Sequence, residues 1–175
     1  MVSNLTNLTQ TYSLEAIIDC TLYSSLKKVI VVTGYVLRFT NSLIKKLKHH
    51  DDLITEDVIT VPEFEHALFR WLKVEQLALK KPANYANLRS SMNLFEDNDG
   101  LLRLKGRFAN SGLEYEQQYP IILRGRDSCF THLVILDAHQ SVMHHGVETT
   151  LAYVSRKYWI VRGRKTILRM FYGSV

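Results

Sequence analysis

Cysteine is scarce in this chain of 175 residues, which contains only Cys20 and Cys129. Two thiols so far apart argue against a disulfide framework, and we expect both to be small buried side chains in a reducing compartment. Long apolar runs are missing too. The longest run, from Val29 to Leu37, is broken by polar and glycine positions and falls far short of the roughly 20 residues that cross a bilayer. A leader with a basic start and an apolar stretch is also absent. These absences predict an intracellular protein, in the cytoplasm or nucleus, with no membrane partner.

Acidic residues are few in the last third of the chain. Residues 121–175 contain eight Lys and Arg but three Asp and Glu, whereas residues 1–120 contain fourteen of each sign, so the net charge of +5 lies entirely in the last third. Such a basic surface suits a polyanion such as nucleic acid, although a solvated basic face also explains the charge. The candidate nucleic-acid-binding residues are Arg156, Lys157, Arg162, Arg164, Lys165 and Arg169.

Apolar residues recur at helical spacing through the first half of the chain. They predict one long amphipathic helix over residues 24–48 and a second over residues 61–81. The first residues are polar and aperiodic, so residues 1–22 are expected to be an N-terminal tail. The two long helices then define a helical linker region over residues 23–92.

Three helix boundaries carry local signals. Thr60 precedes Glu63 by three residues, with Pro62 between them, and this arrangement is a capping box that opens the second long helix. Pro82 ends that helix, because proline cannot continue the hydrogen-bond ladder. Further on, Asp127 is expected to cap a helix that begins at the next residue.

The period of the sequence changes over residues 93–124. Two short alternating apolar runs, which begin at Leu94 and Leu101, flank an acidic turn that ends in an Asp-Gly pair. This pattern predicts a β-hairpin, and residues 120–123 predict one more short strand. The acidic turn lacks the distal glutamate of a calcium loop, so we expect no calcium there.

Histidines gather where one predicted helix ends and the next begins. The helix over residues 128–142 carries His139 on its apolar side, and His144 lies five residues later, past the helix end. A turn there can return the second imidazole toward the first, so that both share one metal ion. His145 competes for the same role, and spacing alone does not decide between them. A single histidine on an apolar face is more often a hydrogen-bonded core residue.

Two more helices are expected after the histidines. Gly146 permits a sharp turn into a helix that the apolar spacing carries from Val147 to Tyr158, and residues 158–160 join it to a third helix over residues 164–171. The small core of this part is expected to contain Leu133, Leu136, Leu151, Val154, Trp159, Ile167 and Met170.

These motifs follow one another in a defined order. An apolar helix is followed by His-x4-His, Gly-Val, Thr-Leu, Tyr-Trp-Ile and Gly-Arg, carried by His139, His144, Gly146, Val147, Thr150, Leu151, Tyr158, Trp159, Ile160, Gly163 and Arg164. This order resembles the zinc-binding N-terminal domain of retroviral-type integrases, in the form found in BEL/Pao retrotransposon polyproteins. Residues 24–29, 35–39, 101–107 and 120–123 resemble the segment that precedes this domain, so the likeness covers about residues 22–175.

The resemblance implies a mainly α fold with a small β-hairpin, in which a helical N-terminal part precedes a three-helix zinc-binding domain at residues 125–175. In that family two His and two Cys bind one Zn²⁺, and the His ligands match His139 and His144. Ser174 stands where the first Cys is expected and the second would lie beyond Val175, so the domain is expected to be truncated before its Cys pair. Each missing thiolate removes a short, charge-neutralising bond, and we therefore expect zinc binding to be weak or absent.

The resemblance also implies a non-catalytic module, which binds DNA or a partner during DNA integration and can self-associate. The chemistry of the family belongs to a separate acidic core, and no His-Glu-x-x-His helix or paired general base accompanies the histidines here. Cys129 has no orienting His-Asp pair. We therefore expect no enzymatic activity and no small-molecule substrate. Two alternatives stay open: a structural or multimerising segment, and a decayed element fragment without activity.

Overall fold

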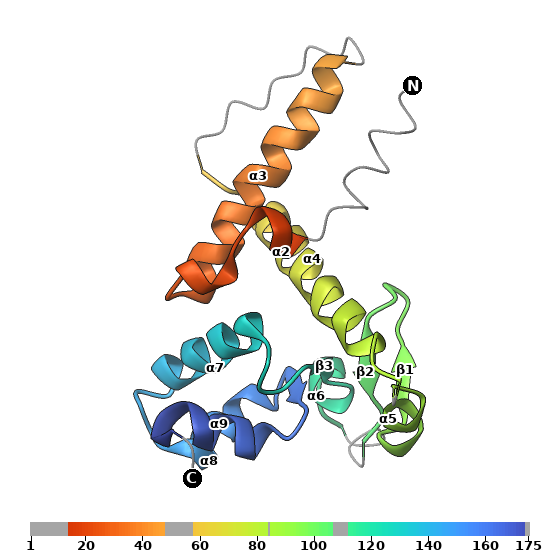
Figure 1. Cartoon of the computed structure of the whole chain (residues 1–175), viewed down its shortest axis with the longest axis vertical. Coiled ribbons are helices and arrows are strands. Elements are labelled where there is room, and N and C mark those ends of the chain that lie inside the picture. The colour runs from red at the N-terminus through yellow and green to blue at the C-terminus, as the bar shows by residue number, and fades with distance from the viewer. Residues whose placement is uncertain (1–13, 48–57, 84, 107–111, 174–175) are drawn as a thin grey trace. The chain divides into compact units, whose positions relative to one another are not determined.

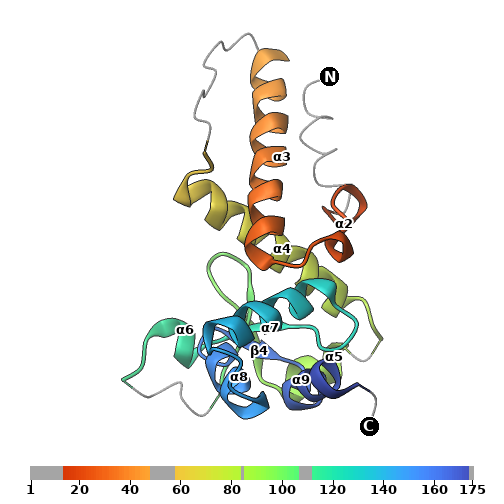
Figure 2. The ribbon, with the colours of Figure 1, turned by 90° about the vertical axis from the view of Figure 1, so that its left-hand side faces the viewer.

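The computed structural model describes residues 14–47, 58–83, 85–106 and 112–173. The chain is mainly helical with a small four-stranded mixed sheet, as Figures 1 and 2 show. It divides into two compact units, Met1–Val74 and Glu75–Val175. No helix in the described ranges is both long enough and apolar enough to cross a membrane.

Two long helices form most of the first unit. They are α3 (Leu26–Leu47) and α4 (Val61–Lys80), preceded by the short α2 (Leu14–Ile17) and the 3₁₀ helix η1 (Cys20–Leu22). The two long helices predicted from the apolar spacing are thus confirmed within the described residues. The last residues of α4, from Glu75 on, belong to the second unit.

Polar contacts join α3 to α4 at two levels inside the first unit. The buried Trp71 indole donates a hydrogen bond to the Thr33 hydroxyl at 2.8 Å, and that hydroxyl donates to the Val29 carbonyl at 2.7 Å. Nearer the start of α4, Arg38 Nε donates to Glu63 Oε1 at 2.7 Å, and its Nη2 pairs with the other carboxylate oxygen. Both pairs fix which faces of the two helices meet.

Glu63 also closes the capping box predicted from the sequence. Its Oε2 accepts the Thr60 backbone N–H at 2.9 Å and the Thr60 hydroxyl at 2.8 Å, so the predicted start of α4 is confirmed. The Arg38 guanidinium lowers the pKa of the Glu63 carboxyl to about 2, and the bonds from Thr60 act in the same direction. The Glu63 carboxylate therefore bonds both to α3, through Arg38, and to the start of its own helix, through Thr60.

The second unit is built on a sheet with strand order β1-β2-β3-β4. β1 (Leu94–Glu96) and β2 (Leu102–Leu104) form the predicted antiparallel hairpin, and β3 (Ile121–Leu123) confirms the predicted short strand. β4 (Tyr158–Ile160) pairs with β3 in parallel. The short helices α5 (Tyr85–Ser91) and α6 (Tyr115–Gln118) precede β1 and β3.

The strand β4 shows that two expectations were wrong: residues 158–160 are not a connector, and the preceding helix does not reach Tyr158. That helix ends at Val154. Tyr158 and Ile160 are buried, whereas Trp159, expected in the core, is 39% exposed. This alternation is the period of a strand, but three residues are too few to distinguish it from a helix end by sequence. The hairpin region and the C-terminal region consequently share one sheet.

Three helices follow β3 along the chain. They are α7 (Cys129–Ser141), α8 (Val147–Val154) and α9 (Gly163–Tyr172), and α8 packs against both of the others. Figures 1 and 2 show the three side by side. α9 confirms the third predicted helix. Of the core predicted here, Leu133, Val154 and Ile167 are buried.

The cap of α7 is Ser128, so the predicted cap at Asp127 is wrong. The Ser128 hydroxyl accepts the Thr131 backbone N–H at 2.9 Å, whereas the Asp127 side chain is 90% exposed. Both residue types are good N-caps. Only the position immediately before the first helical turn can reach the N–H groups, and the sequence does not fix that position to one residue.

The second unit has its own apolar core and a polar clamp beside it. Leu79, Leu94, Leu102 and Ile122 form a buried cluster. The buried Gln76 amide donates to the Leu102 carbonyl at 2.9 Å, and its oxygen accepts the Leu102 N–H at 2.7 Å. Because a buried amide is costly without partners, these bonds hold the end of α4 in register with β2.

Candidate metal centre at the end of helix α7

A Schellman motif ends α7 and places His139 beside His144. Val142 is the C-cap, the Met143 N–H donates to the Gln140 carbonyl at 3.0 Å, and the His144 N–H donates to the His139 carbonyl at 2.9 Å. These two bonds define the motif. Met143 and His144 both have left-handed backbones, with φ of 51° and 62°. The second of the two bonds joins residues that are five positions apart, and His139 and His144 are those residues.

The two imidazole rings lie close together. Their centroids are 4.7 Å apart, with 75° between the ring planes, and the His139 ring also lies 4.2 Å from the Phe171 ring of α9. Two imidazoles bound to one tetrahedral zinc at about 2.0–2.1 Å have ring centres about 5 Å apart. The separation of His139 and His144 therefore suits a shared ion.

Thr150, a fully buried residue of α8, decides which nitrogen of His139 is available. Its hydroxyl donates to the Gly146 carbonyl at 2.8 Å and lies 3.1 Å from His139 Nδ1. A hydroxyl has a single hydrogen, so the Thr150 oxygen accepts and His139 Nδ1 donates. The other ring nitrogen, Nε2, keeps its lone pair. Metal-binding histidines are usually oriented in this way by a bond from the second nitrogen.

The charge state of His139 also suits a ligand. Its pKa lies below the ordinary value, first because burial disfavours the charged ring and then because a positive charge on His144 repels one on His139. Neutral imidazole is the form that binds metal. At neutral pH the His139 ring is therefore uncharged and has one nitrogen available.

His145 is placed differently from His144. Its Nδ1 lies 2.7 Å from the Val142 carbonyl, which can only accept, so this exposed ring donates to the end of α7. The ring contact to His139 comes from His144. Within the described ranges no group of three or more His, Cys, Asp or Glu could hold a metal, and Ser174, the expected position of a Cys ligand, lies outside them.

The predicted nucleic-acid-binding residues fall into two groups. Three of them have partners: Arg164 pairs with Glu148 at 2.7 Å, Lys157 pairs with Glu116 at 3.7 Å, and Arg156 lies over the Tyr153 ring. The others lie on or next to α9. Arg162 and Lys165 are exposed at its start, and Arg169 is half-buried two turns along.

Sequence reasoning missed the orienting role of Thr150 and a pocket that Arg126 and His132 line with Arg169. Thr150 lies four residues after Gly146, the spacing at which a helical Thr hydroxyl bonds the earlier carbonyl, and this was the available signal. For the pocket, the available signal was Arg126, which lies just before the N-terminus of a predicted helix. A helix N-terminus favours anions, and an adjacent arginine adds to that preference.

Comparisons of the chain with protein-family models, with curated proteins and with solved structures found no match. The functional assignment therefore depends on the residues and the geometry described above.

Proposed function

We propose that this chain is a non-catalytic, integrase zinc-binding-like module of a retrotransposon-derived protein, related to BEL/Pao polyproteins. In this proposal α7, α8 and α9 are the three-helix domain, and the module binds nucleic acid or a partner during DNA integration. The observation that carries it is the His139–His144 pair, with ring centroids 4.7 Å apart at a helix end and one nitrogen oriented by Thr150.

His139 and His144 are the ligands in this proposal, and zinc acts as a structural ion. Two neutral imidazoles hold zinc far more weakly than a set of four that includes thiolates. The ion would join the end of α7 to the turn before α8, and so stabilise that turn. Weak binding is therefore the expected behaviour of these residues.

Metal titration tests the ligand assignment. We expect Zn²⁺ to bind the full chain weakly at pH 7.5, and His139→Ala or His144→Ala to weaken that binding by about tenfold or more, because each removes one of two ligands. The matched control is His145→Ala, which removes an adjacent imidazole and should change the affinity by less than about twofold. Equal losses for all three variants would contradict the assignment.

A repaired ligand set tests the relation to integrases. Ser174→Cys, combined with a second Cys added three residues further on, should raise zinc affinity and the zinc-dependent gain in thermal stability well above those of the parent chain. The same chain with Ser at both positions is the control. If the repaired chain gains nothing from zinc by calorimetry, the integrase relation is wrong, whatever the two histidines bind.

DNA binding and self-association make different predictions. Binding of DNA through phosphates weakens steeply as salt rises, with a slope of about −0.9 per phosphate contact. The double variant Arg162→Gln/Lys165→Gln should therefore make this negative slope shallower by about two. The control Lys27→Gln/Lys28→Gln, in the first unit, should leave the slope unchanged. If no DNA binds at low salt and sedimentation shows a dimer, the structural or multimerising alternative is favoured.

A further inference from the structure

A pocket of about 290 Å³ lies between α7, α9 and the segment that precedes α7. This volume is near the lower end of the range for small-ligand sites, about 300–1,000 Å³. Its polar lining comes from three parts of the chain and consists of Arg126, Ser128, His132, Thr166 and Arg169. It contains none of the histidines of the candidate metal centre.

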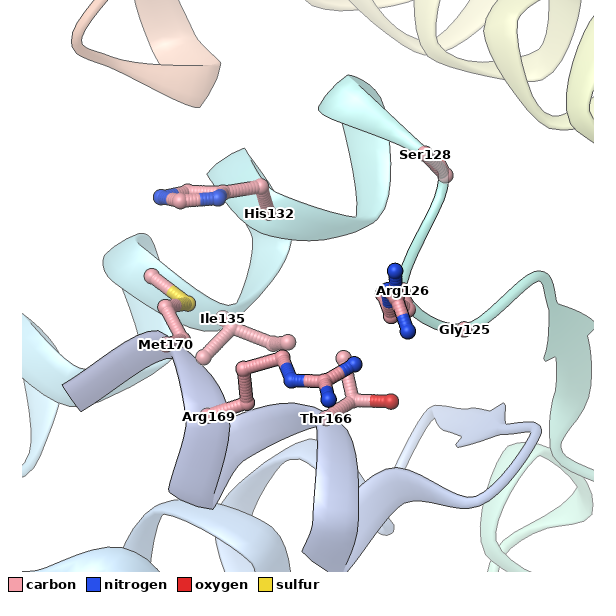
Figure 3. A pocket seen from close by; sticks show the side chains of 8 residues that line it. All are labelled: Gly125, Arg126, Ser128, His132, Ile135, Thr166, Arg169 and Met170. Atoms are coloured by element: carbon pink, nitrogen blue, oxygen red, sulfur yellow. The ribbon is translucent and has the colours of Figure 1, made fainter. Parts of the chain in front are cut away.

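Two guanidinium groups reach this pocket. In Figure 3 the Arg169 guanidinium lies next to Thr166, and the Arg126 side chain is seen nearly end-on beside Gly125. In the described part of the chain, no hydrogen bond or ion pair engages the Arg169 guanidinium or the His132 ring. Arg126 has one ionic neighbour, Asp127, at 3.7 Å, and both side chains are mostly exposed. Such a solvated pair is weak, so both arginines are available to an anion.

A third arginine nearby, Arg124, differs from these two because a buried carboxylate binds it. Arg124, two residues before Arg126, makes two hydrogen bonds to the buried Glu75 carboxylate, at 2.8 and 2.9 Å. It is therefore committed to the core of the second unit. Arg169 has no equivalent acid among the residues that line the pocket.

The rest of the lining favours an anion over a cation. Among the described residues, no Asp or Glu lines the pocket. The N-terminus of α7, a helix of 13 residues, begins at its wall and adds the partial positive charge of the helix dipole. The Thr166 hydroxyl donates its hydrogen to the Arg162 carbonyl at 3.2 Å, so it is not counted among the donors to an anion. Ile135 and Met170 supply an apolar wall.

We infer that this pocket binds a phosphate group through Arg126, Arg169 and His132, with the start of α7 assisting. Paired guanidinium forks match the oxygens of phosphate, and charge-assisted bonds of this kind are the strong ones. The phosphate group can come from a phosphomonoester or from the backbone of a nucleic acid. The inference stands whether or not the chain is related to integrases, because it uses none of the proposed zinc ligands.

Nuclear magnetic resonance titration of the full chain tests this site at constant ionic strength. The probes are inorganic phosphate, a trinucleotide with a 5′-phosphate, and the same trinucleotide without it. We expect saturable shifts of the backbone amides of Gly125, Cys129 and Thr166. Arg126→Gln and Arg169→Gln should each weaken binding about tenfold or more, since each removes a charge-assisted bond. Lys105→Gln removes one positive charge from an exposed position just after β2, outside the pocket, and should change binding less than about twofold.

The three probes separate the two sources of phosphate. Tighter binding of inorganic phosphate and of the 5′-phosphorylated trinucleotide supports a monoester, and equal binding of both trinucleotides with weak inorganic phosphate supports a backbone phosphate. The inference is overturned if no probe shifts these amides, or if Arg126→Gln and Arg169→Gln behave like Lys105→Gln. Arg126 is exposed, so its variant keeps the fold and the result is interpretable even if Arg169→Gln unfolds.

Discussion

The backbone N–H of His144 donates to the backbone carbonyl of His139 at 2.9 Å. This bond spans five residues and belongs to the turn that ends α7, so the turn itself brings the two side chains together. A side-chain contact between these two positions of the motif is common in any helix that ends in this way. The metal interpretation therefore depends on what accompanies the contact, which is the Thr150 bond to His139 Nδ1 and the lowered pKa of His139.

Met143→Gly should stabilise the chain. Met143 occupies the left-handed position after the cap with φ of 51°, and its side chain is 81% exposed. A left-handed backbone costs a non-glycine residue about 1–2 kcal/mol, and glycine adds about 0.5–1 kcal/mol of unfolded-state entropy. The expected net gain in the free energy of unfolding is about 0.5–1 kcal/mol, measured by chemical denaturation.

Gln140→Gly is the matched control for that substitution. Gln140 is also exposed but lies inside α7, where glycine costs about 1 kcal/mol relative to a good helix former. The two glycine variants should therefore change stability in opposite directions. A loss of stability in Met143→Gly would mean that the turn at the histidines is not left-handed there.

Thr150→Val should weaken metal binding without removing a ligand. Valine has a similar shape but no oxygen to accept the His139 Nδ1 hydrogen, so the ring loses its orientation and its preferred tautomer. Loss of such an orienting partner typically costs about 10–100-fold in metal affinity. The zinc titration should show a loss in this range, and ¹⁵N spectra of the His139 ring should show a mixture of tautomers. Unchanged spectra would show that Thr150 does not hold the ring.

Elements with a repeated apolar period or a strong local signal could be predicted from this sequence, whereas the strand β4 could not. α3, α4 and the β1–β2 hairpin have several repeats of their apolar period or a strong turn signal, and all three were predicted correctly. β4 has three residues, and its assignment depends on β3, which is more than thirty residues earlier in the chain. A parallel pairing of this kind leaves no local signal, because its partner is chosen by tertiary packing.

The candidate site shows the same limit at the level of single residues. The spacing of His139 and His144 indicated that a turn could join them, but the helix end has Met143 where glycine is usual, so no residue type marked the turn. The sequence also did not show which of His144 and His145 has its ring beside His139. In the structure the His144 ring contacts His139, whereas the His145 ring bonds to the Val142 carbonyl.

Gly125→Ala should destabilise the second unit strongly. A Cβ at this position would lie 2.4 Å from the Val161 carbonyl oxygen. That oxygen belongs to the backbone just after β4, whose N–H bonds the Leu123 carbonyl at 3.1 Å, so it cannot move without disturbing the β3–β4 pairing. We expect a loss of about 2–3 kcal/mol in the free energy of unfolding, the upper range for overpacking.

Gly112→Ala is the control for this effect. In the described part of the chain, no heavy atom beyond Gly112 and its two chain neighbours lies within 4 Å of a Cβ at that position. The substitution should therefore leave stability unchanged or raise it slightly by restricting the unfolded chain. Similar losses for the two alanine variants would argue that the cost at Gly125 is a general effect of removing glycine and not a clash with Val161.

Acid should remove the stabilisation that the Arg38–Glu63 pair provides. The folded-state pKa of Glu63 is about 2, below its ordinary value of 4.5, mainly because Arg38 bonds the carboxylate. A carboxyl with a lowered pKa binds its proton more weakly in the folded state, so its contribution is full above about pH 4.5 and disappears as the pH falls toward 2. Because the Glu63 side chain is 27% exposed, we expect about 1–2 kcal/mol. The difference in stability between the parent chain and Glu63→Gln should therefore shrink across that interval, as measured by denaturation at each pH.

Glu65→Gln is the control for the acid prediction, because Glu65 is an exposed neighbour of Glu63 on α4. Its stability should differ from that of the parent chain by an amount near zero at every pH. If the difference between the parent chain and Glu63→Gln persists at pH 2, the effect of Glu63 comes from packing and not from charge.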